Sequence, residues 1–184
     1  MQEARKKVVA RRTLKRTVDS LKQAGKRVVF TNGCFDLLHV GHVHCLEGAR
    51  RRGDCLVVGI NSDASMQKMK GPRRPIVPEK ERAEVLAAVA CVDWVTIFEE
   101  PDPLALISLL LPDVLVKGAD WKEEEIIGAD LVRGAGGKVV RINLKLGLST
   151  TRLIERILTR YADKGSGGPV DEAADSEPRA DEGG

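Results

Sequence analysis

From Lys26 onward, short runs of Val, Ile and Leu alternate with longer stretches that suit helices. This alternation constrains the fold more than any other feature, because a strand, a covering helix and a next strand form the unit that builds a parallel sheet. The runs are rich in β-branched residues, and their alternation with helices is typical of a parallel sheet that is covered on both faces. We therefore predict an α/β fold, a Rossmann-like doubly wound sheet of about five parallel strands flanked by helices, in a single domain.

The expected elements follow from these apolar runs and the residues that flank them. The predicted strands are residues 27–31, 55–60, 94–98, 114–116 and 138–142. The predicted helices are residues 13–23, 41–51, 78–90, 103–110, 123–134 and 149–161. Pro78 and Pro103 stand in the first turn of their helices, where a missing N–H is tolerated, and Gly25 is a typical stop signal.

Charge is distributed unevenly along the 184 residues, although 30 Lys and Arg against 27 Asp and Glu leave a net charge of only +3. Residues 1–16 carry seven basic side chains, and residues 163–184 carry seven acidic ones. We expect a basic helical segment over residues 1–25, the folded domain over 26–162 and a disordered acidic tail over 163–184, which has hardly any large apolar residue. The nearly neutral domain argues against a dedicated nucleic-acid-binding protein.

The four cysteines, Cys34, Cys45, Cys55 and Cys91, form no C-x-x-C pair, and the sequence has no secretory apolar segment at its start. Reduced thiols in a cytoplasmic protein are the simplest interpretation. Zinc ligation would need a companion cluster that the sequence lacks. No apolar run reaches the roughly 18–20 residues that cross a bilayer, so we expect no membrane partner.

The first predicted strand runs directly into a turn that contains two histidines. A doubly wound sheet binds its ligand at this place, where the carboxyl end of a strand faces the beginning of a helix. His39 and His42 project to one side of that helix, and Gly41 between them leaves room for a close approach. Two imidazoles and free N–H groups suit a polyphosphate. Ordinary surface histidines, or a metal site completed by a distant Asp, are the alternatives.

A second motif, Gly147-Leu148-Ser149-Thr150-Thr151, stands at the start of the last predicted helix. Hydroxyl and N–H groups at a helix N-terminus are suited to a phosphate. The alternative interpretation is a plain Ser/Thr cap of the helix.

Together these motifs resemble the signatures of the cytidylyltransferase-like nucleotidyltransferases, which read G-x-F-D, H-x-G-H and G-x-S-T-T. Within that superfamily the sequence is most similar to the adenylyltransferase half of bifunctional heptose enzymes, over about residues 21–158. The particular marks are Asn61-Ser62-Asp63-Ala64-Ser65, Lys70-Gly71 before Arg74-Pro75-Ile76, Val92-Asp93-Trp94-Val95, and Leu115-Val116-Lys117-Gly118-Ala119-Asp120-Trp121. Ala119 and Trp121 are departures, since the last stretch commonly reads K-G-G-D-Y in that family.

The resemblance implies an enzyme that transfers AMP from ATP to a sugar 1-phosphate, D-glycero-β-D-manno-heptose 1-phosphate, and releases pyrophosphate. The product, ADP-heptose, is a precursor of the lipopolysaccharide core. A separate sugar kinase would then supply the acceptor, Mg²⁺ would accompany ATP, and a homodimer is the default expectation.

Three alternatives remain open from the sequence. A cytidylyltransferase acting on glycerol 3-phosphate usually carries an Arg where this chain has Leu144, although Lys145 or Arg141 offers a substitute charge. A non-catalytic nucleotide-binding module is the second alternative, against which the intact motifs argue. A nicotinamide-dependent dehydrogenase is disfavoured, because no G-x-G-x-x-G follows the first strand.

The resemblance also assigns roles to individual residues. The catalytic residues are His39, His42 and Lys70. The nucleotide-binding residues are Thr31, Asn32, Gly33, Cys34, Phe35, Gly41, Asp120, Trp121, Ser149, Thr150 and Thr151. The substrate-binding residues are Asp36, Arg74 and Arg82, and no residue is assigned as a metal ligand. The alternatives are a solvated basic loop around Lys70 and Arg74, a surface salt bridge from Arg82 to Glu79 or Glu81, and a capping Asp120 beside a packed Trp121.

Overall fold

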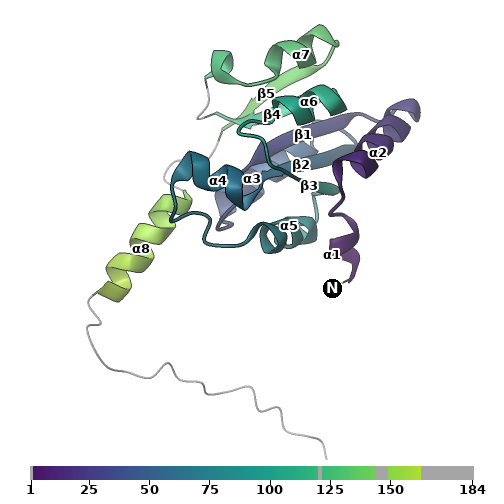
Figure 1. The fold of residues 1–184 in the computed structure, drawn as a ribbon. Coiled ribbons are helices and arrows are strands. Elements are labelled where there is room, and N and C mark those ends of the chain that lie inside the picture. Colours follow the sequence, from purple (N-terminus) through teal and green to yellow (C-terminus); the bar gives the residue numbers. More distant parts are fainter. Residues whose placement is uncertain (1, 120–121, 144–148, 163–184) are drawn as a thin grey trace, which may run out of the picture.

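The computed structural model describes residues 2–119, 122–143 and 149–162 (Figure 1). One sheet of five parallel strands forms its centre, in the order β3-β2-β1-β4-β5. The strands are β1 (Val28–Gly33), β2 (Cys55–Asn61), β3 (Trp94–Phe98), β4 (Val114–Gly118) and β5 (Lys138–Ile142). The predicted Rossmann-like fold is confirmed, and two of the five predicted strands have the observed bounds.

The central strand is β1, which pairs with β2 on one side and with β4 on the other. Val29 shows this register, since it lies opposite Leu56 of β2 and Val114 of β4. The chain builds β1, β2 and β3 in one direction and then crosses back to add β4 and β5. The order therefore reverses between β1 and β4, and doubly wound sheets bind ligands in the crevice at such a reversal.

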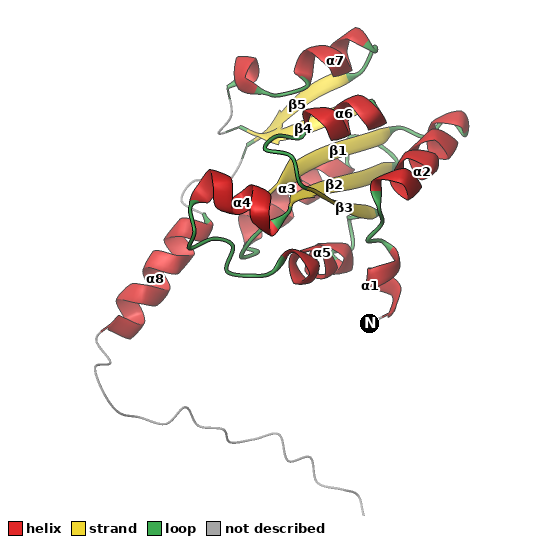
Figure 2. Ribbon diagram, in the orientation of Figure 1, coloured by secondary structure: helices red, strands yellow, loops and turns green. Residues whose placement is uncertain are grey.

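Helices cover both faces of the sheet (Figure 2). On one face pack α2 (Arg11–Gln23), α6 (Leu104–Leu110) and α7 (Ala129–Gly134), and on the other pack α3 (Val40–Arg50) and α5 (Glu79–Ala88). Neighbouring strand residues serve the two faces in turn: Val28 and Phe30 belong to the first core and Val29 to the second. Burial on both faces explains why the inner strands β1, β2 and β4 are rich in apolar residues, whereas the edge strand β5 carries Lys138 and Arg141 at exposed positions.

The basic N-terminal segment packs against the domain through α2 and the short helix α1 (Gln2–Lys6). Leu14 and Val18 of α2 are completely buried in the core, while the basic side chains of the same helix face outward. Between the two helices, Val8 forms a parallel bridge to Val95 of β3. The acidic tail predicted over residues 163–184 lies outside the described residues.

The predicted helix over residues 123–134 is wrong as a single element. The structure has a short 3₁₀ turn at Glu123–Glu125 and then α7, with Gly128 between them. Gly128 has a φ of +84°, in the left-handed region, and a Cβ there would come within 2.9 Å of the Ile107 side chain on α6. The break therefore lets the backbone approach α6 closely.

The helix α4 (Asp63–Lys70), which follows β2, was not predicted. It begins at an N-cap, Ser62, whose hydroxyl accepts a hydrogen bond from the Ser65 N–H at 3.1 Å. It ends at Gly71, which has a φ of +90°. Lys70 is therefore the last residue of a helix and not part of a loop, whereas Arg74 does lie in the loop that follows.

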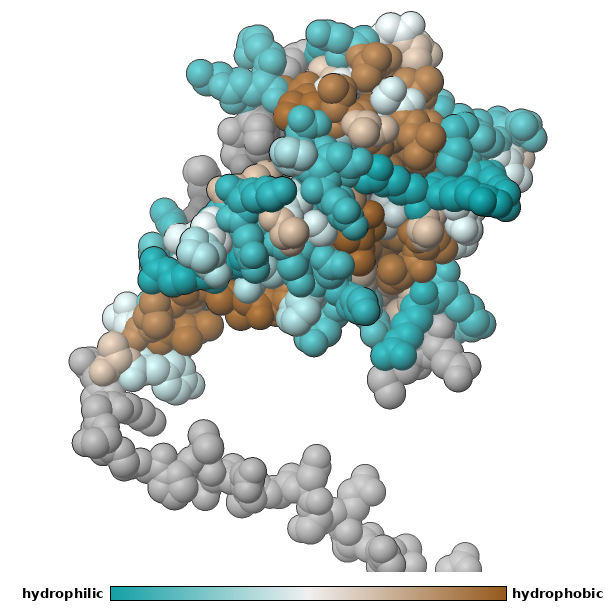
Figure 3. All heavy atoms as spheres, viewed as in Figure 1, coloured by the Kyte–Doolittle hydropathy of each residue, from teal (hydrophilic) through white to brown (hydrophobic). Residues whose placement is uncertain are grey.

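The last helix, α8 (Thr150–Ala162), extends away from the domain (Figure 1). None of its residues is buried, although its apolar residues fall on one side. Figure 3 shows hydrophobic residues gathered on α8, and Ile157, Leu158 and Tyr161 are all at least half exposed. Among the described residues, every helix is too short or too polar to cross a lipid bilayer.

Candidate active site

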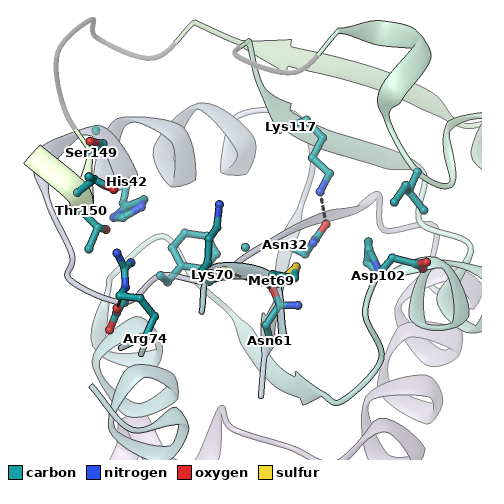
Figure 4. A pocket seen from close by; sticks show the side chains of 18 of the residues that line it. Asn32, His42, Asn61, Met69, Lys70, Arg74, Asp102, Lys117, Ser149 and Thr150 are labelled. Carbon is teal, nitrogen blue, oxygen red and sulfur yellow. Dashed lines mark hydrogen bonds and ion pairs between the residues drawn. The ribbon is translucent and has the colours of Figure 1, made fainter. Parts of the chain in front are cut away.

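A cavity of about 480 Å³ opens at the carboxyl edge of the sheet, where the strand order reverses (Figure 4). Its volume lies in the range typical of small-ligand sites. The walls come from the β1–α3 turn, the end of α4 with its following loop, the segment after β3, the end of β4 and the start of α8. The lining residues are Asn32, Gly33, Cys34, Phe35, Asp36, His39, Gly41, His42, Asn61, Met69, Lys70, Arg74, Pro101, Asp102, Pro103, Lys117, Glu125, Ile127, Ser149, Thr150 and Thr151.

The turn that leaves β1 folds tightly against α3. Phe35 has a φ of 47°, which is uncommon for a residue with a side chain and costs conformational energy. This backbone conformation directs the Phe35 ring toward His42, with the ring centroids 5.2 Å apart. A Cβ at Gly33 would come within 3.1 Å of the same ring. The shape of the turn therefore brings the Phe35 ring into contact with the His42 ring.

His39 and His42 form a stacked pair at the beginning of α3. Their ring centroids are 3.8 Å apart and the planes differ by 19°. The Nδ1 atoms of both rings are buried, and neither has a hydrogen-bond partner among the described residues. Buried polar nitrogens are normally satisfied, so these two atoms are exceptions at a site whose histidines both line the cavity.

Burial lowers the pKa of both histidines. The pKa of His42 falls from an ordinary value of 6.5 to about 4, because burial and then the neighbouring His39 disfavour its charged form. Burial also lowers the pKa of His39. At neutral pH both rings are therefore neutral, and each carries one N–H donor and one acceptor nitrogen.

Asp36 has a side chain that is 0% exposed, although the residue borders the cavity. Its Oδ1 accepts hydrogen bonds from the N–H groups of Ile76 and Val77, both at 2.9 Å. Its Oδ2 pairs with Arg74 Nε at 2.6 Å. Both carboxylate oxygens therefore accept hydrogen bonds from the loop after α4. These hydrogen bonds hold that loop against the β1–α3 turn.

Arg82 is also fully buried, with a side chain that is 0% exposed. Its guanidinium donates to three backbone carbonyls and one carboxylate, those of Val77, Cys34, Asn61 and Asp63. A surface salt bridge to Glu79 or Glu81 is thus the wrong interpretation. Arg82 lies beneath the cavity wall and ties the ends of β1 and β2 to α4 and the loop that follows it.

The ends of β2 and β4 contribute two further polar groups. Lys117 of β4 is 7% exposed, and its Nζ donates to Asn32 Oδ1 of β1 (Figure 4). Asn61 of β2 is 4% exposed, and its Nδ2 donates to Ser65 Oγ at 3.0 Å. Lys70, at the end of α4, also borders the cavity. Cations from α4, the next loop and β4 thus line the same cavity as the histidine pair.

The start of α8 closes one end of the cavity. Ser149 Oγ accepts from the Arg152 N–H at 3.2 Å, so Ser149 caps the helix as the alternative interpretation expected. Thr150 Oγ1 donates to the Leu37 carbonyl of the β1–α3 turn at 3.4 Å. Figure 4 shows Ser149 and Thr150 beside His42, so the two sequence motifs meet at one end of the cavity.

Most of the residues assigned from the sequence line this cavity, and a few do not. Thr31 is buried within β1 and Arg82 lies below the wall, so neither borders the cavity. Asp120 and Trp121 are outside the described residues, as are Gly147 and Leu148 of the second motif. Sequence reasoning missed eight lining residues: Asn61, Met69, Pro101, Asp102, Pro103, Lys117, Glu125 and Ile127.

The side chains described at this site are poorly placed to bind a metal ion directly. Over the described residues, no group of three or more His, Cys, Asp and Glu side chains is placed to hold a metal ion. Asp36 borders the cavity, but Arg74 and backbone N–H groups occupy both of its oxygens. The lining is better suited to an anion, because neutral donors and cations face the cavity at its histidine end.

A doubly wound sheet with a cavity at its switch point, lined by cations and neutral donors, is the arrangement typical of nucleotide-binding α/β proteins. The family model "Cytidylyltransferase-like" matches residues 30–156, which include the whole β1–α3 turn and the start of α8. The chain therefore belongs to the cytidylyltransferase-like family and is a nucleotidyltransferase.

Curated relatives match most of this chain. The "Bifunctional protein HldE" of Syntrophotalea carbinolica is 55% identical over 155 residues, which is 84% of this chain and 32% of that protein. The protein of the same name from Trichlorobacter lovleyi is 49% identical over 158 residues, 86% of this chain and 32% of its own length. The chain thus spans about a third of the length of these relatives.

A solved structure gives an independent likeness. The lipopolysaccharide core biosynthesis protein from Thermoplasma volcanium superposes with a TM-score of 0.55 and 29% sequence identity. The match covers 66% of this chain and 98% of that one.

Proposed function

We propose that the chain transfers AMP from ATP to D-glycero-β-D-manno-heptose 1-phosphate, forming ADP-heptose and pyrophosphate. The observation that carries this proposal is the meeting of the stacked, unpartnered histidines with Ser149 and Thr150 at one end of a cavity. The similarity to bifunctional HldE proteins supports heptose 1-phosphate as the acceptor. The structural neighbour, a lipopolysaccharide core biosynthesis protein, supports the same assignment.

In this reaction a phosphate oxygen of the acceptor attacks the α-phosphorus of ATP, and the bond to the bridging oxygen of pyrophosphate breaks. The protein supplies position and charge stabilisation, without a covalent intermediate. The N–H groups of His39 and His42 would donate to the triphosphate and stabilise the negative charge that develops on the leaving group. Lys70 and Arg74 would contribute positive charge from the neighbouring wall, and Ser149 and Thr150 would bind the terminal phosphates.

Mg²⁺ would enter this site with the triphosphate, whose oxygens provide ligands of the kind it prefers. Asp36 does not fit as a ligand, because its two oxygens are already occupied. We assign the described residues no direct part in holding the ion.

A sugar kinase would supply the acceptor, and we place both reactions in the cytoplasm, where ATP is abundant. The homodimer expected by default stays a prediction.

Turnover tests this proposal directly. Purified protein is given ATP and heptose 1-phosphate, and pyrophosphate release and ADP-heptose are measured for wild type and His42→Ala. Removal of a donor to developing charge typically costs about 10²–10³ in kcat, so we expect a loss of that size in a variant that remains folded. Equal turnover by the two proteins would contradict the role of His42.

Two controls separate the alternatives. CTP with glycerol 3-phosphate tests the cytidylyltransferase activity, which we expect to be far slower. ATP binding without pyrophosphate release, with every acceptor tried, would indicate a non-catalytic nucleotide-binding module and overturn the proposal.

A further inference from the structure

Among the acidic residues that line the cavity, Asp36 accepts the most hydrogen bonds from described residues. A carboxylate beside a triphosphate site repels the substrate unless a cation neutralises it. Here the carboxylate is buried, pairs with Arg74 Nε at 2.6 Å and also accepts from two backbone N–H groups. All of these donors belong to residues 74–77, in the loop between α4 and α5.

The hydrogen bonds of Asp36 and Arg82 form a closed network between the loop and the β1–α3 turn. The Val77 N–H donates to Asp36 Oδ1 at 2.9 Å, and the Val77 carbonyl accepts from Arg82 Nε at 2.9 Å. Arg82 Nη1 also donates at 2.6 Å to the carbonyl of Cys34, two residues before Asp36. The loop is therefore held to the β1–α3 turn at both its N–H and its carbonyl groups, by two side chains with no exposure.

The orientation of Arg74 links these hydrogen bonds to substrate binding. Its Nε faces Asp36, and its side chain is 16% exposed at the cavity wall. Figure 4 shows the guanidinium pointing toward the end of the cavity where His42 and Thr150 lie. An arginine anchored through Nε keeps its two terminal nitrogens for a second partner, and their planar arrangement matches a phosphate.

We propose that Asp36 is a positioning residue that holds Arg74 in the orientation that binds the triphosphate. Asp36 touches neither the substrate nor a metal ion; it acts through Arg74. This differs from its expected role as a substrate-binding residue, and it rests on the proposed function only in taking a triphosphate as the ligand. The carboxylate fixes the Nε edge of the guanidinium before the ligand arrives, so binding does not have to order that side chain.

The test uses binding of inorganic tripolyphosphate to the full chain, measured by titration calorimetry. The variants are Asp36→Asn, Arg74→Gln and the double variant. Arg73→Gln is the matched control, since it removes the same charge from the adjacent, exposed position that does not line the cavity. Loss of one charge-assisted hydrogen bond lowers affinity by about tenfold or more, and we expect that loss in each single variant. The control should change affinity by less than about twofold, because exposed charges are well screened.

The double variant distinguishes positioning from independent effects. If Asp36 acts through Arg74, the double variant binds no more weakly than the weaker single variant. Losses that multiply in the double variant would overturn the proposal. So would wild-type affinity in Asp36→Asn, which is the result that a purely structural role predicts once the variant is folded.

Two further measurements keep the test decisive. Arg74→Gln leaves the backbone contacts of Asp36 in place, so its unchanged affinity would overturn the proposal even if Asp36→Asn failed to fold. Amide hydrogen exchange at Ile76 and Val77 should accelerate in Asp36→Asn and stay near wild type in Arg73→Gln. Tripolyphosphate binding needs no acceptor, so a wild type that binds it but makes no ADP-heptose would contradict the proposed function alone.

Discussion

The wall of the cavity built from the β1–α3 turn and the loop before α5 is held by two buried side chains, Asp36 and Arg82, with hydrogen bonds to several backbone groups each. The wall at the start of α8 contacts that turn through a single hydrogen bond among the described residues, from Thr150 Oγ1 to the Leu37 carbonyl at 3.4 Å. No residue of α8 is buried.

This difference in hydrogen bonding and burial indicates that the two walls have different roles in the site. The wall that carries the histidines is preorganised, so groups that stabilise developing charge need not move during the reaction. The α8 wall gains little from packing, because a helix of this length is only marginally stable without tertiary contacts. A bound triphosphate would therefore order α8 more than it orders the histidine wall.

The largest expected effect comes from breaking the preorganised wall at Arg82. Arg82→Met leaves three backbone carbonyls without their donor, and each acceptor left unsatisfied costs about 1–3 kcal/mol. Asp63 also loses its partner, but its side chain is 35% exposed and water can solvate it. We therefore expect the free energy of unfolding to fall by about 3 kcal/mol or more. Urea unfolding followed by circular dichroism measures this change. Arg52→Met, at an exposed position, should stay within about 0.5 kcal/mol of wild type. Similar values for the two variants would contradict the rigid wall.

A smaller effect follows from the lowered pKa of His42. Below its ordinary pKa of 6.5 the unfolded chain takes up a proton that the folded chain resists until about 4. The stability contribution of the neutral ring is therefore present above 6.5 and is lost as pH falls toward 4. We expect the free energy of unfolding to fall more steeply across this window in wild type than in His42→Ala. Parallel pH profiles would show that burial does not hold the ring neutral.

The smallest effect should come from the α8 wall. Ser149→Ala removes a helix cap worth about 1 kcal/mol, but α8 contributes no buried residue to the core. Helix content should drop slightly while the urea midpoint stays unchanged. Ser149→Asn, which retains capping ability, is the matched control. A lowered midpoint in Ser149→Ala would mean that α8 is part of the cooperative core, and the contrast between the walls would be lost.

The sequence predicted the sheet well because each strand is a short run rich in β-branched and apolar residues, separated from the next by a helical stretch. The strands over 94–98 and 138–142 have the predicted bounds. The helix α4 was missed because its eight residues carry little apolar periodicity, so its stability depends on the Ser62 cap and tertiary contacts. The break at Gly128 was missed for a related reason, since it arises from the approach of Ile107 on a different helix.

The site could be predicted only in part, for the same physical reason. The histidines and the Ser-Thr-Thr run are local motifs, and their placement at strand and helix ends is readable from sequence alone. Asn61 is the last residue of β2, and Lys117 follows the apolar residues of β4. A polar residue that closes a buried run is a signal of a site that can be recognised in the sequence. Asp36 and Arg82 form hydrogen bonds with residues that are distant in the sequence. No local sequence pattern shows these contacts.

The central claim is that the β1–α3 turn and the start of α8 bind the same ATP molecule. Hydrogen exchange across an ATP titration tests this most directly, with peptides covering residues 33–42 and 149–156. Both segments should become protected with one shared midpoint, and α8 should show the larger gain. Protection of one segment alone, or two separate midpoints, would contradict the account.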